Sequence, residues 1–198
     1  MTDPVLGWRV WKLRSGRLGS WAVDYCWEPG ENRATCLTPG RRACSASPGQ
    51  HCQCGFWAVW SPRRCAARVC SAAEPPWHVM GLIAGWGTVA LHDGEGFRAE
   101  WAAMKCLFTD RPWSSSIPGW LARWWRRKTG RTDESDPGTL QDRRHWHALE
   151  GVAERYAVPL VSLETAASLG LLSELGVPSD QIEEARNLGA GSWPRNGW

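Results

Sequence analysis

Four cysteines between positions 36 and 54, a segment called the cysteine loop here, constrain the fold of this chain more than any other feature. Two segments of seven residues, LTPGRRA and SASPGQH, connect the first three cysteines, and each segment contains a Pro-Gly pair. Because Pro-Gly pairs favour tight reversals, the chain can turn back twice within a short length. In an extended segment Cys52 and Cys54 also point to the same side. The spacing therefore predicts that four thiolates converge.

Converging thiolates suit a structural zinc ion, which takes four tetrahedral Cys or His ligands and keeps no open coordination position. We therefore predict zinc as a cofactor, with these ligands: Cys36, Cys44, Cys52 and Cys54. The spacing differs from that of a CxxC knuckle, and two alternatives stay open. The cysteines can be small buried hydrophobic residues, or His51 can replace Cys44, although a strand would point His51 away from Cys52. The other cysteines show no convergent spacing with a histidine and are expected in the core or in loops: Cys26, Cys65, Cys70 and Cys106.

The cellular compartment bears on what the eight cysteines do. The N-terminal segment MTDPVLGWRVWKLRSG has no apolar stretch behind a basic start, and no run of eighteen apolar residues occurs in the chain. We therefore expect a cytoplasmic protein without a transmembrane segment. In a reducing compartment, a local group of cysteines is better explained by metal binding than by disulfides.

The first half of the chain has the residue pattern of β-strands. GWRVWKL at 7–13 and SWAVDYCW at 20–27 predict an antiparallel pair, and GFWAVW at 55–60 predicts a third strand. VMGLIAGWGTVALH at 79–92 predicts a long fourth strand, which turns at 93–96 into FRAEWAAMKCLF.

From Pro112 onward the apolar residues have helical spacing. IPGWLARWWRRKTGR predicts a short basic helix, and further helices are predicted in TLQDRRHWHALEGVAERYA, LETAASLGLLSELG and PSDQIEEARNLG. We therefore expect an α+β fold, with an antiparallel β-rich core and its zinc-stapled loop followed by C-terminal helices. The expected divisions are the β-rich core at 1–110, a basic Trp-rich helix and polar break at 111–137, and a helical C-terminal extension at 138–198.

Three stretches carry a family resemblance: WEPGENRATC, CQCGFWAV and GLIAGWGTVALHDGEGFRAEWA. Together they resemble a family of uncharacterised, mostly actinobacterial proteins with CxCG, WGxV and GxRA motifs, over about residues 7–108 and weakly in the C-terminal helix. In that family a histidine often stands at the position of Cys44, so the resemblance implies a metal ligand there and favours Cys44 over His51. It also implies that the cysteine loop and the segment around Trp86 and Arg98 belong to one scaffold. No function transfers from it.

The strand at 79–92 has one face that is nearly bare of side chains, because glycines alternate along it. Glycines inside a strand mark a bend, a bulge or the close approach of a backbone or ligand. Two interpretations stay open. A small-ligand or enzyme pocket would use Trp86 as a stacking wall and Arg98 as an anion contact, with His92 and Glu95 beside them. A purely structural arrangement would pair Arg98 with a nearby carboxylate and place Trp86 in the core.

Catalytic motifs give no support to a reaction. A GxGxxG that opens a helix, GxxxxGK[ST], HExxH and GxSxG are absent. His147 and Glu150 would share one helical face, which is more typical of a solvent-exposed pair than of an acid–base site. We therefore assign no enzymatic activity from the sequence.

Positive charge and tryptophan coincide between Arg111 and Arg131. A net charge of +3 excludes a globally cationic nucleic-acid-binding protein, but this segment is locally basic. Arginines neutralise phosphates while exposed indoles stack on unpaired bases. The segment thus predicts binding of single-stranded nucleic acid or a protein partner, through Trp120, Arg123, Trp124, Arg126 and Arg127. In the alternative interpretation these tryptophans pack on the β core and the arginines are solvated. A zinc-stabilised, non-enzymatic recognition module is the favoured function.

Overall fold

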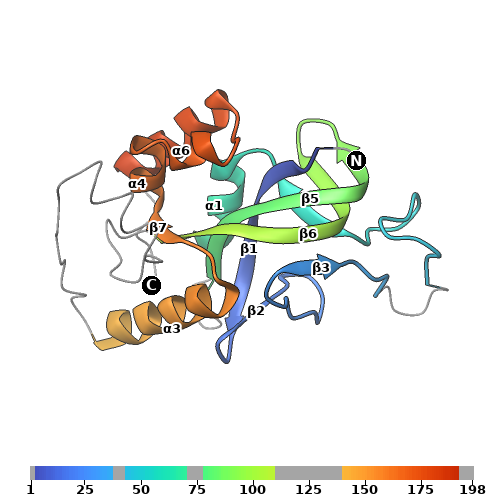
Figure 1. Ribbon diagram of the computed structural model, residues 1–198, viewed down its shortest axis with the longest axis horizontal. Coiled ribbons are helices and arrows are strands. Elements are labelled where there is room, and N and C mark those ends of the chain that lie inside the picture. The colour runs from blue at the N-terminus through green and yellow to red at the C-terminus, as the bar shows by residue number, and fades with distance from the viewer. Residues whose placement is uncertain (1–2, 38–42, 71–77, 110–139, 192–198) are drawn as a thin grey trace.

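The computed structural model describes residues 3–37, 43–70, 78–109 and 140–191 (Figure 1). These residues form a mixed seven-stranded sheet with helices contributed mainly by the C-terminal part of the chain. The expected α+β fold with a β-rich core is therefore confirmed. No helix among these residues has the length and apolar character needed to cross a membrane. The predicted basic helix and polar break at 111–137 lie outside the described residues.

The chain begins with a hairpin of β1 (Val5–Arg14) and β2 (Arg17–Gly19). Ser15 and Gly16 form its turn, and both have a positive φ, as two-residue hairpin turns of type I′ require. The predicted second strand at 20–27 is wrong in extent. After β2 the Ser20 N–H donates a hydrogen bond of 2.7 Å to the Tyr25 carbonyl, which closes a loop in place of a strand.

The remaining strands of this half are β3 (Glu31–Arg33), β4 (Phe56–Val59), β5 (His78–His92) and β6 (Gly96–Thr109). The predicted strand at 55–60 and the long hairpin that turns at 93–96 are both confirmed. β1 pairs with β5, β5 with β6, β6 with β4 and β4 with β1, so these pairings close a ring. Its weakest closure is the β1–β4 seam, which consists of the single pair Trp8↔Val59.

Phe97 of β6 fills the space left by two glycines on neighbouring strands. A Cβ added at Gly85 of β5 would lie 2.5 Å from the Phe97 ring, and one at Gly7 of β1 would lie 2.6 Å from it. Real side chains do not tolerate such contacts, so the glycines are needed for close packing of the ring. The bare face that the sequence shows at 79–92 is therefore occupied by a core aromatic side chain.

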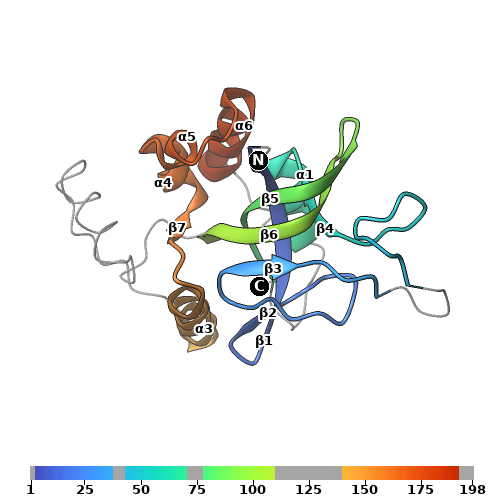
Figure 2. The same cartoon turned by 45° about the vertical axis from the view of Figure 1, so that its right-hand side comes forward.

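The C-terminal part contains α3 (Leu140–Tyr156), β7 (Leu160–Ser162), α4 (Leu163–Ser168), α5 (Leu171–Glu174) and α6 (Ser179–Gly191). The helices were predicted, but β7 was not, and it joins the sheet parallel to β6. Figure 2 shows α3 on one side of β7 and α4–α6 on the other. α3 packs on the hydrophobic cluster that contains Trp11 and Phe97, and α4–α6 pack, together with α1 (Pro62–Cys70), on the cluster that contains Trp8 and Phe108.

Candidate metal centre

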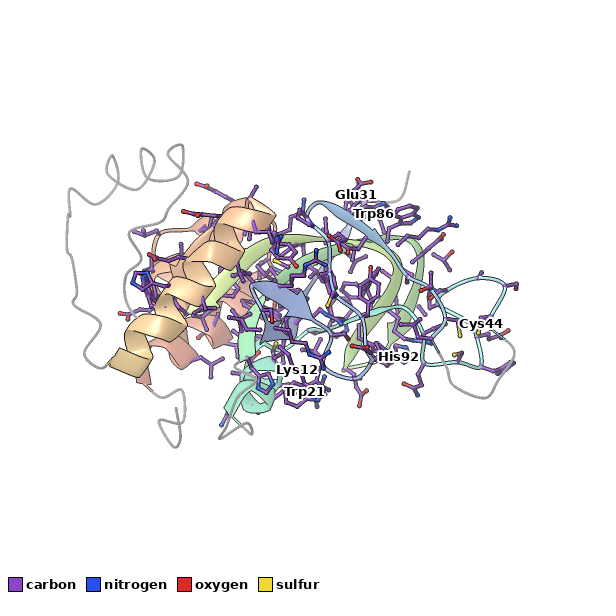
Figure 3. All side chains as sticks on the ribbon, turned by 90° about the horizontal axis from the view of Figure 1, so that it is seen from below. Lys12, Trp21, Glu31, Cys44, Trp86 and His92 are labelled. Carbon is purple, nitrogen blue, oxygen red and sulfur yellow. The ribbon has the colours of Figure 1, made fainter. Side chains whose placement is uncertain are left out.

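The described parts of the cysteine loop lie at one end of the molecule, where Figure 3 labels Cys44. Four Sγ atoms of this loop form a cluster in which all lie within 4.8 Å of one another, and their cysteines are half-buried: Cys36, Cys44, Cys52 and Cys54. These are the four residues that the sequence predicts. His51 is exposed and does not belong to the cluster.

The separations fit metal ligation and exclude disulfides. The Cys36 and Cys52 Sγ atoms are 3.7 Å apart, far beyond the roughly 2.05 Å of a disulfide bond. Four sulfurs placed tetrahedrally at about 2.3 Å from one ion would be roughly 3.8 Å apart. The cluster is therefore close enough to hold one metal ion with four thiolates.

Crowding of the sulfurs has an electrostatic consequence. Hydrogen bonding from the Cys44 thiol to Cys36 and Cys52 raises the pKa of Cys44 to about 12, because these contacts stabilise the protonated form. Four thiolates at these separations would repel one another strongly unless a cation lay between them. The geometry thus suits thiolates when a metal ion is bound and thiols when it is absent.

Gly49 makes the convergence of the sulfurs possible. Its N–H donates to Cys54 Sγ over 3.1 Å, and its carbonyl accepts from the Cys52 N–H over 3.3 Å. A Cβ at this position would lie 2.6 Å from Cys44 Sγ. Backbone N–H groups that point at thiolate sulfurs orient the ligands and stabilise their charge. From the sequence, this glycine is predicted only as part of a turn, and its contact with the ligands is not.

We expect Gly49→Ala to weaken metal binding by roughly tenfold, because the methyl group would push Cys44 away from the other ligands. Competition against a colorimetric chelator measures this change. Gly151→Ala is the matched control, because a Cβ at Gly151 of α3 meets no atom within 4 Å. Equal metal affinity of the Gly49 and Gly151 variants would contradict the assigned role.

Arg98 of β6 ties the cysteine loop to the sheet. Its side chain is buried, and its Nη1 donates to the carbonyl oxygens of Gly49, Cys52 and Cys54. Its Nε donates to Nε2 of His92 over 2.9 Å. From the sequence, a carboxylate partner or an anionic ligand is expected for this arginine. The hydrogen-bond partners found here are backbone carbonyls and an imidazole.

The aromatic ring of Trp57 contacts both His92 and Arg98. Trp57 of β4 stacks on the His92 ring, with centroids 4.5 Å apart and an interplanar angle of 27°. The Arg98 guanidinium carbon lies 5.4 Å from the centroid of the Trp57 ring. Trp57 and His92 thereby fix the orientation of Arg98, which in turn positions the ligand-bearing backbone.

The residues of the predicted small-ligand pocket are distributed over the β5–β6 hairpin. His92 and Arg98 are in contact, whereas Trp86 pairs with Trp101 further along the hairpin and is half-buried. Figure 3 shows Trp86 and His92 apart from each other. Glu95 is exposed and lines a cavity to which β4 also contributes.

Other chemically reactive groups are set apart from the cluster. Cys65 and Cys106 are buried, and burial raises the pKa of both thiols. The Nδ1 atom of His147 lies 3.2 Å from a carboxylate oxygen of Glu150, and the exposed His147 ring makes this a surface pair. The predicted binding residues between Trp120 and Arg127 lie outside the described part of the chain.

Comparison of the chain with protein-family models, with curated proteins and with solved structures found no match.

Proposed function

We propose that this protein is a zinc-stabilised, non-enzymatic recognition module. The observation that carries the proposal is the four-cysteine cluster, in which protein thiolates would fill all four positions of a tetrahedral ion. Catalytic zinc sites keep one position for water or substrate. A closed site instead supports a structural role, in which the ion holds the cysteine loop against the sheet.

Zinc is the metal that this ligand set favours. Tetrahedral sites of four soft thiolates are characteristic of zinc and of iron–sulfur chemistry. Among divalent ions zinc binds such ligands more tightly than iron does. The buried guanidinium of Arg98, hydrogen-bonded to the loop, supports the proposal further, because its charge would offset the net negative charge of a zinc ion with four thiolates.

The proposed partner is single-stranded nucleic acid, bound by the segment from Arg111 to Arg131. The support is the sequence pattern, in which cationic side chains and indoles occur in one short segment: Arg111, Trp113, Trp120, Arg123, Trp124, Trp125, Arg126, Arg127, Lys128 and Arg131. Phosphate contacts supply affinity without base specificity, and indoles stack on bases of any sequence. A folded zinc-stabilised core would serve to display this segment.

Simultaneous replacement of Arg123, Arg126 and Arg127 by glutamate is expected to abolish salt-sensitive binding to single-stranded DNA or RNA, because phosphate contacts act through charge. Filter binding at two salt concentrations measures the effect. Metal content and the unfolding transition should not change.

The control for this experiment carries the same change of charge elsewhere. Its glutamates replace three exposed arginines of α1 and α6: Arg63, Arg64 and Arg186. This control should bind nearly as well as the natural sequence. Absence of binding by the natural chain at low salt would refute the nucleic-acid proposal and leave a protein partner to be sought.

A further inference from the structure

A cavity of about 500 Å³ lies beside the cysteine loop and has no role in the function proposed above. β1 and β4 contribute to its lining, as do the loop that follows β2, the cysteine loop and α1. Its volume is within the range of small-molecule sites, which is roughly 300–1,000 Å³.

The strand pairing explains why a cavity forms here. β4 leaves β1 after the single pair Trp8↔Val59, and β2 pairs with β1 from Lys12 onward. In the described part of the chain, the intervening residues of β1 have no ladder partner on this edge. Arg9 lies in this gap. Its Nη1 donates to the Trp57 carbonyl and its Nη2 donates to Ser20 Oγ over 3.2 Å, so it bridges the two sides of the opening.

Exposed apolar side chains gather at the same cavity. Among the described residues, the large hydrophobic side chains with high exposure are Trp21 at 38%, Val23 at 45%, Leu37 at 44% and Leu91 at 66%. The first three of these four line the cavity. Exposed apolar residues that cluster in a concave site mark a binding surface more often than residues scattered singly do.

The cavity also contains a cation that lacks a carboxylate partner. Arg9 forms no ion pair within the described residues, its Nε has no hydrogen-bond partner there, and its guanidinium carbon lies 5.1 Å from the centroid of the Trp27 ring. The pKa of Arg9 is lowered to about 10, mainly by burial and in smaller part by the nearby positive charge of Arg68, so Arg9 stays protonated at neutral pH. Arg68 also lines the cavity, so two positive charges face one partly apolar space. Arg9 is hydrogen-bonded through both Nη atoms but has no counter-ion among the described residues, and an anion in the cavity would balance its positive charge.

The residues that line the cavity indicate which class of anion it would bind. Arg9 and Arg68 are both lining residues, and guanidinium groups are planar and match a carboxylate in a two-pronged hydrogen-bonding geometry. Glu95 is the carboxylate among the described lining residues, and its charge disfavours a ligand with several negative charges. Trp21 and Leu37 offer apolar surface to a flat ring.

We propose that this cavity binds a small aromatic carboxylate, with its carboxylate at Arg9 and Arg68 and its ring against Trp21 and Leu37. The cysteine loop forms one wall through Leu37, Gln53 and Cys54. Removal of the metal therefore disorganises the cavity and weakens binding.

The test is isothermal titration of the metal-loaded full chain with 2-naphthoate, 2-naphthyl phosphate and the uncharged 2-naphthylmethanol. The carboxylate binds at least tenfold more tightly than the uncharged compound and more tightly than the phosphate. Arg68→Gln and Trp21→Ala change exposed side chains and each weaken 2-naphthoate binding at least fivefold. Arg9→Gln removes the preference for 2-naphthoate over the uncharged compound. The affinities of this variant are compared after thermal unfolding has shown that its unfolding transition is cooperative.

Leu91→Ala is the matched control, because Leu91 is exposed but does not line the cavity, and it leaves the affinity unchanged. The proposal is overturned if 2-naphthoate does not bind, if it binds no better than the uncharged compound, or if Leu91→Ala weakens binding as much as Trp21→Ala. Tighter binding of the phosphate overturns the carboxylate assignment. None of these outcomes depends on binding of nucleic acid by the segment from Arg111 to Arg131.

Discussion

Replacement of Cys52 or Cys54 by serine is expected to remove the bound metal and to lower the free energy of unfolding by about 4 kcal/mol. The magnitude follows from linkage, because a ligand present at roughly 1,000 times its dissociation constant stabilises the folded state by about that amount. A serine hydroxyl is a poor substitute for a thiolate ligand, and three remaining sulfurs leave the ion open to water. Elemental analysis and thermal unfolding measure the two effects.

Cys26→Ser is the matched control for these variants. Cys26 is half-buried like the cluster cysteines, but its sulfur is not part of the group that could hold a metal. This variant should retain the metal and change stability by less than about 1 kcal/mol. Full metal content in both the Cys52 and Cys54 variants would refute the assigned ligand set.

Arg98→Met is expected to destabilise the fold by about 3 kcal/mol and to weaken metal binding by roughly 10- to 100-fold. Methionine retains much of the buried aliphatic volume but removes the donors to the loop carbonyls and to His92. The loop that carries Cys52 and Cys54 would then lose its anchor on β6. Denaturant unfolding and a chelator competition give the two values.

Two further variants show whether the charge of Arg98 or its planar set of donors is responsible for the expected losses of stability and metal affinity. Arg98→Lys keeps the charge but lacks the planar fork of donors, so it should recover less than half of the lost metal affinity. Arg64→Met removes an exposed arginine whose Nη1 donates to the Gly94 carbonyl over 3.1 Å, and it should change stability by less than about 0.5 kcal/mol. Metal affinity that Arg98→Met does not alter would show that Arg98 has no influence on the cluster.

The parts of the structure that the sequence predicts are those with a strong local signal. Two Pro-Gly pairs between regularly spaced cysteines predict the cluster, because each pair specifies a reversal of the backbone. The β5–β6 hairpin is predicted by a long apolar run, a Gly-containing turn and a second run. α3 is predicted by apolar residues at helical spacing, of which Leu149, Val152, Ala153 and Tyr156 are buried against the sheet.

The parts that the sequence reasoning missed depend on contacts between distant segments. Arg98 binds carbonyl oxygens, and since every residue has one, such partners leave no trace in the sequence. β7 has three residues, all buried, which is too short for a periodic pattern. The alternation in SWAVDYCW is typical of a strand, yet the hydrogen bond from Ser20 to Tyr25 makes it a loop beside the cavity. The placement of Arg9 in the β1–β4 seam likewise follows from the pairing of strands far apart in sequence.

X-ray absorption at the zinc K-edge of the purified protein tests the central claim most directly, together with elemental analysis. The proposal predicts one zinc ion per chain, surrounded by four sulfur atoms at about 2.3 Å. Substoichiometric metal after purification without chelators would contradict it. So would a shell that contains nitrogen or oxygen neighbours at about 2.0 Å, because such a shell would show that the four cysteines do not close the site.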